Sequence, residues 1–352
     1  MSAPRPAPAI RRDVTSLDVA RLAEVSQSAV SRSFTPGASV ATATRARVLE
    51  AARKLGYRPN AIASTLSTRR SRMIAVVVSS LQNQFYPVVL ESLSQRLQKD
   101  GYHVLLFITE TEDADADTLL VELLRYQVDG IVMASTHLSS GLAQQIAEAR
   151  IPVVMFNRSN RAGATKAGSI STVSSDNHGG GRAVAHFLAD GGHSRVAYLA
   201  GAEDSSTNHD RERGLRDGLA ERGLRPVARA VGNYRFDHAA QATLELFGSL
   251  VSSGDRPDAL FVASDHMAFA AIDTLRGALG LRVPEDVSVV GFDNVPQAEW
   301  GAYQLTTVAQ DVAPMVEATV QMLLRQLEDD AVARDHVVIP AALVVRASAR
   351  RP

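Results

Sequence analysis

The chain has 352 residues, 45% hydrophobic and 21% charged, which fits a globular protein of two or three units. It contains no cysteine, which excludes disulfides, zinc–thiolate sites and thiol catalysis, and no apolar run approaches the ~20 residues needed to cross a bilayer. The net charge of −1 is unevenly distributed: residues 1–72 hold 13 Lys and Arg against 4 Asp and Glu (+9), and the remainder holds 24 against 34 (−10). A cationic first segment indicates a phosphate-binding surface in that part of the chain.

The first residues, MSAPRPAPAIRR, lack the apolar core of a signal peptide. Their Pro and Ala content predicts a disordered arm over residues 1–13. We therefore expect a cytoplasmic protein.

Residues 15–34 predict two short helices joined by a tight turn. Thr15 and Ser16 precede an apolar-periodic run and are candidates for the helix N-cap. Glu24 and Val25 form the expected turn, with Val25 filling the angle between the helices. The expected buried stripe of the first helix consists of Leu17, Ala20 and Ala23.

The second helix of this pair has the chemistry of a DNA-recognition helix. Ser26 is its expected cap, and Ala29 and Val30 face inward, which leaves Gln27, Ser28 and Arg32 facing outward. Gln can pair with adenine and Arg with guanine in the major groove, and a helix-turn-helix unit presents the start of its second helix to base edges. The alternative is an ordinary surface helical hairpin.

Residues 42–56 predict a third helix with Thr42 or Thr44 as its cap, Val48, Ala52 and Leu55 as its apolar positions, and Gly56 as its end. The segment that follows, AIASTLSTRRS, has Ala63 and Leu66 on one side. It is too short and too polar to form a helix alone in water, so it is either a linker or a helix that forms on a partner.

From Met73 onward, short apolar strands alternate with amphipathic helices, which predicts parallel sheets covered on both faces and divided between two subdomains. The expected strands are 73–80, 103–108, 130–135, 152–156, 169–173, 195–201, 258–264 and 287–292. The expected helices are 86–99, 114–126, 139–149, 178–190, 207–222, 236–251 and 265–279. The last part, LTTVAQD, a helix over 311–328 and VVIPAALVVRAS, is expected to cross back and complete the sheets.

Several motifs occur in one order along the chain: DVARLAEVSQSAVSR, TRARVLEAARKLGYRPNAIASTL, SSDNHGGGRAVAHFL, DRERGLRDGL, FVASDHMA and VPEDVSVVGFDN. In these motifs the chain resembles the lactose-repressor/galactose-repressor family of bacterial transcription regulators. The resemblance implies an all-α helix-turn-helix headpiece, joined by a hinge helix to an α/β core of two doubly wound subdomains like that of periplasmic sugar-binding proteins.

The resemblance also sets the expected domain boundaries. They are 14–59 for the headpiece, 60–70 for the hinge helix and 71–352 for the core. Within the core, the first subdomain is expected to comprise about 71–165 with part of 305–335. The second is expected to comprise about 166–304 with the C-terminal segment, and the split lies in the loop near 157–170.

For DNA binding, the resemblance places Gln27 and Ser28 at the specificity-setting positions and Arg32 at the position that meets a guanine. Leu66 matches the hinge leucine that wedges into the minor groove and bends the duplex. The pair Gln27-Ser28 departs from the bulky or apolar residues of many relatives, so the operator cannot be copied from them. The expected DNA-binding residues are Thr15, Ser16, Ser26, Gln27, Ser28, Ser31, Arg32, Asn60, Ala63 and Leu66.

For the effector, Asp293, Arg211 and Asp176 match family contact positions, and Asn157, Ser264 and Tyr234 match less closely. Asn or Asp is common where Ser264 stands. Aromatic side chains can stack on a flat apolar ligand face; the candidates are Phe85, Phe156, Tyr234 and Trp300. Each residue also has a structural alternative: Asp293 and Asp176 can cap helices, Arg211 can be a surface charge, and Tyr234 can be a core aromatic.

We therefore expect a dimeric regulator, most simply a repressor, that binds a near-palindromic double-stranded DNA operator. The chain ends without a heptad extension, so no tetramer is expected. The expected effector is a carbohydrate or sugar phosphate, with a nucleobase as the alternative. No cofactor, metal or catalytic constellation is expected. The competing interpretations are a sugar-binding transport component, which the cationic first segment disfavours, and an enzyme built on doubly wound domains.

Overall fold

The structure, a computed structural model, describes residues 14–35, 37–58, 70–109, 116–134, 145–146, 148–158, 170–248, 256–329 and 335–352. The chain divides into two compact units, Met1–Ser71 and Arg72–Pro352. The predicted arm, the predicted hinge contacts of Asn60, Ala63 and Leu66, and most of the helix expected at 139–149 lie outside the described residues. Among the described residues, no helix combines the length and apolar composition needed to cross a membrane.

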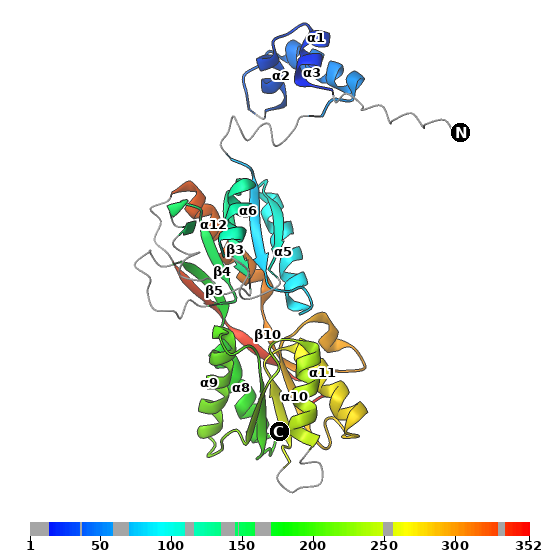
Figure 1. Ribbon diagram of the computed structural model, residues 1–352, viewed down its shortest axis with the longest axis vertical. Coiled ribbons are helices and arrows are strands. Elements are labelled where there is room, and N and C mark those ends of the chain that lie inside the picture. Colours follow the sequence, from blue (N-terminus) through cyan, green and yellow to red (C-terminus); the bar gives the residue numbers. More distant parts are fainter. Residues whose placement is uncertain are drawn as a thin grey trace, which may run out of the picture. The chain divides into compact units, whose positions relative to one another are not determined.

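In its described residues the first unit has the helices α1 (Ser16–Ala23), α2 (Gln27–Phe34) and α3 (Thr42–Leu55), shown in blue in Figure 1. Thr15 closes a capping box with Asp18, and the Ser26 hydroxyl accepts from the backbone N–H of Ala29, so both expected caps are present. Glu24 ends α1 in the left-handed conformation at φ +54°, which produces the tight turn before α2. The helices enclose a small core that includes Val19, Val30 and Val48.

Two details of this unit differ from the sequence prediction. The buried stripe of α1 consists of Val19, Ala20 and Ala23, whereas Leu17 is 46% exposed. Three-residue steps drift around a helix of 3.6 residues per turn, so a stripe that starts at Leu17 leaves the core face. The N-cap of α3 is Ala41, which makes no side-chain capping bond, in place of Thr42 or Thr44. The expected end at Gly56 is confirmed, with φ +67°.

The second unit contains two sheets, and its first sheet has the order β11-β5-β4-β3-β1-β2. Its strands, all parallel, are β1 (Met73–Val78), β2 (His103–Ile108), β3 (Gly130–Ala134), β4 (Val153–Phe156), β5 (Ser171–Ser175) and β11 (His336–Ile339). Successive side chains of β1 enter two different core clusters, one with Ile74 and one with Ala75, which explains its wholly apolar sequence. Helices α5 (Phe85–Lys99) and α12 (Val312–Glu328) pack on one face, and α6 (Ala116–Arg125) packs on the other.

The second sheet has the order β12-β10-β9-β8-β6-β7. Its strands are β6 (Val196–Ala200), β7 (Ala228–Val231), β8 (Ala259–Val262), β9 (Ser288–Asp293), β10 (Thr306–Gln310) and β12 (Ala341–Val344), and only β12 runs antiparallel to its neighbour. Helices α8 (Asn177–Asp190) and α9 (Ser206–Ala220) lie on one side, with α10 (Phe236–Gly248) and α11 (Asp265–Asp273) on the other (Figure 1). A π-helix, η1 (Thr274–Ala278), continues α11, and a 3₁₀ turn, η2 (Pro296–Glu299), follows β9.

Each sheet with its covering helices forms one subdomain, which we also call a layer. Within the described residues, the chain passes from one layer to the other at three connections of one residue each. Asp176 connects β5 to α8, Asp311 connects β10 to α12, and Pro340 connects β11 to β12. Two of these connections lie next to each other, because the backbone N–H of Asp176 donates at 2.8 Å to the carbonyl of Ile339, the residue before Pro340. These connections place polar residues of both subdomains side by side.

The subdomain boundary differs from the expected one. Strand β5 was assigned to the second subdomain, but it pairs with β4 and β11 in the first sheet, because the chain crosses over after Ser175 and not in the preceding loop. Of the C-terminal elements, α12 and β11 belong to the first layer, and β10 and β12 belong to the second. The half-exposed edge strand β7, ARAV, was not predicted because it lacks an apolar run.

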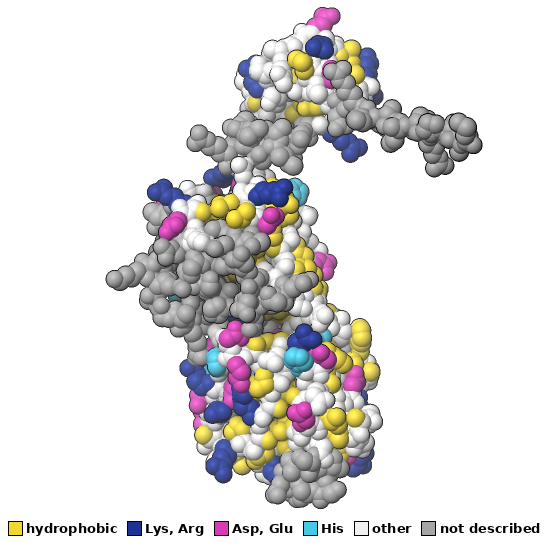
Figure 2. All heavy atoms as spheres, viewed as in Figure 1, with side chains coloured by type: hydrophobic (Ala, Val, Ile, Leu, Met, Phe, Trp, Pro, Cys, Tyr) yellow, Lys and Arg dark blue, Asp and Glu magenta, His cyan; other side chains and the backbone are white. Residues whose placement is uncertain are grey.

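Helices α8 and α9 pack with their backbones in contact. A Cβ atom at Gly214 would lie 2.1 Å from the carbonyl oxygen of His178, and one at Gly181 would lie 2.3 Å from that of Arg211. Ion pairs such as Arg182–Glu221 (2.8 Å) bridge the exposed side of the two helices. Side chains of both charge signs are scattered over the second subdomain in Figure 2. The glycines therefore fix the position of α9, which carries Arg211.

The substitution Gly214→Ala should lower the free energy of unfolding by about 2 kcal/mol or more, since the new methyl group meets backbone that cannot move aside. The matched control is Gly277→Ala, because a Cβ there meets nothing within 4 Å. The control should leave stability unchanged or raise it by up to about 1 kcal/mol. Chemical denaturation of both variants checks this, and equal effects would contradict the close-packing argument.

Candidate DNA interface and effector site

The start of α2 presents an exposed polar surface on the first unit. Gln27, Ser28, Ser31 and Arg32 are all exposed, and Ser26 accepts from Ala29 N–H as the helix cap. The side-chain amide of Gln27 donates to the hydroxyl of Ser16 at 2.9 Å, which connects the starts of α1 and α2. The predicted recognition residues therefore lie together on one exposed helix terminus, and their side chains are held by short-range hydrogen bonds.

Two of these side chains are pre-oriented from within the helix. The Nε of Arg32 donates to the carbonyl of Ser28 at 3.4 Å, and the hydroxyls of Ser26 and Ser28 lie 3.0 Å apart. Arg32 therefore still has its terminal guanidinium nitrogens to offer to a base edge. Thr15 is engaged in the capping box of α1, so its side chain has a structural role in this conformation.

In the second unit, Arg211 and Asp293 form an ion pair that is almost wholly buried. Their side chains are 2% and 3% exposed, and Nη1 of Arg211 lies 3.8 Å from Oδ1 of Asp293. The guanidinium also donates to the carbonyl of Ala263, and it lies over the ring of Phe292 with 3.7 Å between Cζ and the ring centroid. These two predicted effector residues therefore contact each other, and Arg211 is not the surface charge of the alternative interpretation; their contact with an effector stays a prediction.

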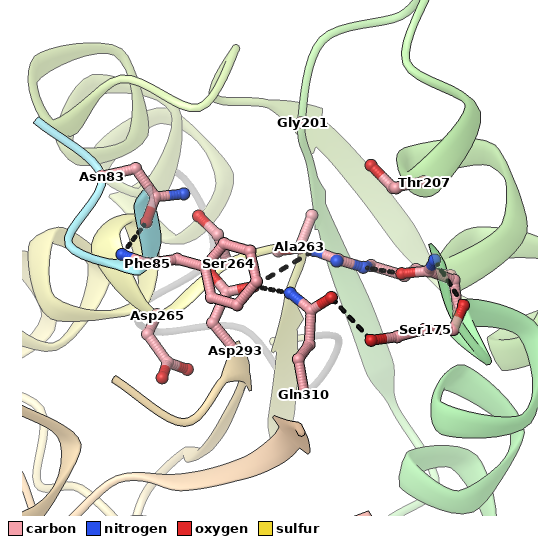
Figure 3. Close-up of polar contacts among 12 residues, drawn as sticks. Asn83, Phe85, Ser175, Gly201, Thr207, Ala263, Ser264, Asp265, Asp293 and Gln310 are labelled. Carbon is pink, nitrogen blue, oxygen red and sulfur yellow. Dashed lines mark hydrogen bonds and ion pairs between the residues drawn. The ribbon is translucent and has the colours of Figure 1, made fainter. Parts of the chain in front are cut away.

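Three further buried residues close this ion pair into a ring, which we call the polar ring (Ser175, Asn177, Arg211, Asp293 and Gln310). Gln310 lies between Ser175 and Asp293 (Figure 3), accepting from the Ser175 hydroxyl at 2.9 Å and donating to Asp293 at 2.6 Å. On the other side, Nε of Arg211 donates to Asn177 Oδ1 at 2.8 Å, and the Asn177 amide donates to the Ser175 carbonyl at 2.9 Å. Ser175, Asn177 and Gln310 adjoin the one-residue connections, so the ring spans both layers.

One carboxylate oxygen of the polar ring is left without a partner. Asp293 Oδ2 is buried and makes no hydrogen bond of ordinary geometry within the described residues, and the same is true of Asn157 Oδ1. The side chain of Asn83 also interacts with the Asp293 carboxyl and lowers its pKa. A buried acceptor without a donor is unfavourable by about 1–3 kcal/mol, so both atoms are places where a ligand hydroxyl or N–H can bind.

A second buried carboxylate lies close to the first. Asp265 accepts from the Thr307 hydroxyl at 2.5 Å and from the backbone N–H of Val295 at 2.9 Å. Burial raises the pKa of Asp293 to about 7, an effect that Arg211 opposes and the charge of Asp265 reinforces. Burial likewise raises the pKa of Asp265 to about 6, against the effect of its hydrogen bond from Thr307.

Aromatic side chains form an apolar wall beside these groups. Phe85 starts α5, is 2% exposed, and has its ring centroid 6.4 Å from that of Phe156. Its backbone N–H donates to Asn83 Oδ1 at 3.0 Å (Figure 3), and Asn83 interacts with the carboxyl of Asp293. The Tyr234 ring packs on Gly201, where a Cβ would come within 2.2 Å of Tyr234 Cζ, and its hydroxyl is 3.2 Å from that of Thr207.

Three of the predicted effector residues have backbones in the left-handed half of conformational space. The φ angles are +55° for Asn157, +55° for Tyr234 and +135° for Asp293. Such conformations are unfavourable for residues other than glycine, and they cluster at functional sites. They support the choice of these positions.

Other predicted residues have structural roles in this conformation. The carboxylate of Asp176 caps α8 by accepting from Gly179 N–H at 2.8 Å, and the hydroxyl of Ser264 caps α11 by accepting from Met267 N–H at 3.4 Å. The polar ring contains neither of them. Trp300 is 56% exposed and does not join the aromatic wall.

The sequence interpretation missed Ser175, Asn177 and Gln310. Each is a single polar residue at the end of a strand or the start of a helix, and no motif spacing connects them, since Ser175 and Gln310 are 135 positions apart. The available signal was their position at strand ends. Gln310 comes directly after the run LTTVA, and Asn177 follows ISTVSS after one intervening residue. Polar residues at strand ends are where open α/β sheets bind ligands.

Two more contacts join the layers near the polar ring. Nδ1 of His266, on α11, lies 3.3 Å from Gln84 Oε1 beside α5, and burial lowers the pKa of this histidine. Arg158, after β4, donates to the hydroxyl of Ser205, which caps α9. The two subdomains therefore contact each other around the site.

The raised pKa of Asp293 gives a stability change with a defined sign. The carboxyl binds its proton more tightly in the folded chain than in the unfolded chain, so it favours folding most below about pH 4, and this contribution is lost as the pH rises through about 7. The variant Asp293→Asn has no such proton. Its free energy of unfolding should therefore fall less than that of the wild type between about pH 5 and about pH 8.

Equilibrium denaturation at a series of pH values measures both curves. The control is Asp237→Asn, since the pKa of that exposed carboxyl is held at about 2 by Arg235 and its titration falls outside this window. Parallel curves for the wild type and Asp293→Asn would contradict the assignment.

Comparison with known proteins agrees with this geometry. Residues 15–60 match the model of bacterial regulatory proteins of the lacI family, and residues 184–349 match a periplasmic binding protein-like domain. The HTH-type transcriptional regulator CelR of Thermobifida fusca is 33% identical over 345 residues, covering 96% of this chain and 99% of that protein. Catabolite control protein A of Priestia megaterium is 28% identical over 342 residues, covering 96% of this chain and all of that protein.

Solved structures extend the likeness to the whole chain. A lac repressor dimer bound to operator and the anti-inducer ONPF superposes with a TM-score of 0.82 at 28% identity, covering 96% of this chain and 99% of that one. A CelR–cellobiose complex gives a TM-score of 0.71 at 31% identity, covering 95% and 99%. The two matched domains occur in the order that the sequence predicted. The chain therefore belongs to the lacI family of bacterial regulatory proteins and is a DNA-binding transcriptional regulator.

Proposed function

We propose that this regulator is a repressor that binds a near-palindromic operator as a dimer and is controlled by a neutral sugar in the site around the polar ring. The observation that supports the effector class is the pair of buried, unpartnered acceptors, Asp293 Oδ2 and Asn157 Oδ1. Asn157 Oδ1 requires a hydrogen donor from the ligand, whereas Asp293 Oδ2 accepts when the carboxyl is ionised and can donate when it is protonated, since its pKa is about 7. Sugar hydroxyls both donate and accept at several points of a small ring.

The DNA part of the proposal rests on the exposed start of α2. Gln27, Ser28 and Arg32 are at the end of the helix that a helix-turn-helix unit presents to the major groove. In a dimer, two such helices would read the two halves of the operator. The lac repressor, a structural relative solved as a dimer bound to its operator, supports this interpretation, since it matches this chain over 99% of its own length.

The electrostatics of the core favour a neutral sugar over a sugar phosphate. The polar ring contains one cation, Arg211, which already contacts Asp293, Asn177 and the Ala263 carbonyl. A phosphate beside Asp293 would also meet the buried carboxylate of Asp265, and like charges in a poorly solvated site repel strongly. The apolar wall of Phe85 suits the C–H face of a pyranose or furanose ring.

The relatives support the same class. The CelR structure is a complex with cellobiose, and cellobiose is therefore one of the sugars to test on this chain. A nucleobase could also stack on Phe85 and donate N–H groups to Asp293. The binding experiment below includes both classes, so it decides between them.

The variant Arg32→Ala should weaken binding to a duplex enriched by in vitro selection by about ten- to a hundredfold, the size expected when an arginine–guanine contact is lost. Gel-shift titration at moderate salt measures this loss. The matched control is Arg53→Ala, which removes an exposed cation from α3 that is paired with Glu50. It should weaken all duplexes alike and only slightly. Equal losses of sequence preference in the two variants would refute the recognition role of α2.

For the effector, thermal shift of the purified chain should be measured with D-glucose, D-galactose, D-ribose, cellobiose, glucose 6-phosphate, adenine and hypoxanthine. A neutral sugar should raise the melting temperature most, because a ligand that binds only the folded state stabilises it. The variant Asp293→Ala should lose this shift and keep operator binding. The exposed Asp237→Ala should keep both. A larger shift with the phosphate or a base, or a sugar shift that survives Asp293→Ala, would refute the proposed effector.

A further inference from the structure

The guanidinium of Arg211 is held on three sides, and one of the three is the connection between subdomains. Its Nη1 donates to the Ala263 carbonyl, its face lies on Phe292, and its Nε donates to Asn177 Oδ1 at 2.8 Å. Ala263 and Phe292 both belong to the second sheet layer. Asn177 starts α8, which also belongs to the second layer, and its amide donates across the connection to the carbonyl of Ser175 in the first layer. A rotation at Asp176 therefore changes the contact between Asn177 and Ser175.

Asn177 uses both ends of its amide. Its Nδ2 donates to the carbonyl of Ser175, the last residue of β5, while its Oδ1 accepts from Arg211. The residue is 4% exposed, so water cannot replace either partner readily. The amide thus forms a rigid link from the end of the first sheet to the side chain that pairs with Asp293.

We propose that Asn177 is a positioning residue that, without contacting the effector, fixes the guanidinium of Arg211 and ties effector affinity to the geometry of the β5–α8 connection. This inference rests on the proposed effector site. Rotation at Asp176 moves the Ser175 carbonyl away from Asn177 Nδ2, which frees the Asn177 amide to leave Arg211 Nε and loosens the ion pair with Asp293. By linkage, an effector that requires the fixed guanidinium favours the connection geometry that provides it.

A purely structural role for Asn177 would be the satisfaction of buried groups at the start of α8. If Asn177 had only this role, its replacement would lower the stability of the protein, and the effect on effector affinity would not depend on Arg211. The two roles are therefore separated by a double-mutant cycle in effector affinity, in which residues that act through one another are not additive.

The cycle comprises Asn177→Ala, Arg211→Lys and the double variant, with affinity measured for the panel sugar that gives the largest thermal shift. Asn177→Ala should weaken that sugar's binding at least about tenfold, as expected for a lost hydrogen bond to a charged group. In the Arg211→Lys background, where the Nε donor is absent, Asn177→Ala should have no further effect. Additive losses would overturn the proposal.

The matched control is Gln326→Ala, which removes another buried amide, one that donates to Ser171 Oγ at 2.9 Å and lies outside the polar ring. It should lower the melting temperature of the free protein and leave the sugar affinity unchanged. A loss of affinity equal to that of Asn177→Ala would show that general destabilisation explains both variants, and would overturn the proposal.

A second measurement needs no sugar. In protein labelled with ¹⁵N-arginine, the Nε–H resonance of Arg211, identified by its absence in Arg211→Lys, should exchange slowly with solvent. It should lose this protection in Asn177→Ala and keep it in Gln326→Ala. Retained protection in Asn177→Ala would overturn the positioning role. If no panel sugar binds although protection behaves as expected, the sugar proposal fails and the hold of Asn177 on Arg211 stands.

Discussion

The organisation of the core depends on one buried charge pair, Arg211 and Asp293, because taking two charges out of water is strongly unfavourable unless their remaining hydrogen-bonding groups are satisfied. This requirement explains the polar residues at the connections between subdomains. Asn177 accepts a hydrogen bond from Arg211, and Gln310 donates one to Asp293. Ser175 is hydrogen-bonded to both of these amides. Asp293 Oδ2 stays unsatisfied among the described residues, and it is the atom that we propose to meet the ligand. The same atoms therefore stabilise the core and form the proposed ligand site.

Local patterns predicted the elements well, because helix caps and apolar runs act over a few residues. Thr15, Ser26 and Gly56 end or begin helices as expected. The predictions were wrong where the pairing of strands distant in sequence determines the structure. Nothing within 171–175 reveals that the strand pairs with residues 336–339 on one side and with β4 on the other. Strand β7 is an edge strand whose half-exposed positions need no apolar side chains, so its sequence carries no signal.

Part of the site could be predicted from the sequence, namely the residues that belong to motifs of the resembled family. Arg211 and Asp293 belong to motifs that the family resemblance marks. Asn177 and Gln310 lie within or beside equally visible motifs, but their role appears only when two distant connections meet in space. Asp176 is an intermediate case: the resemblance marks it as a ligand contact, and one of its carboxylate oxygens caps α8, which was the structural alternative. A polar residue before a helix is ambiguous until its hydrogen-bond partners are known.

The one-residue connections have a consequence for the way the two layers can move. The backbone offers two soft torsions per residue, and the ring of Pro340 removes one of them. With so few torsions at Asp176, Asp311 and Pro340, the layers have little freedom to slide or separate. Motion between them is therefore limited to small rotations at these three connections, and a small rotation there becomes a larger displacement at the far end of each layer. An insertion of even one residue in any connection would decouple the three and abolish that leverage.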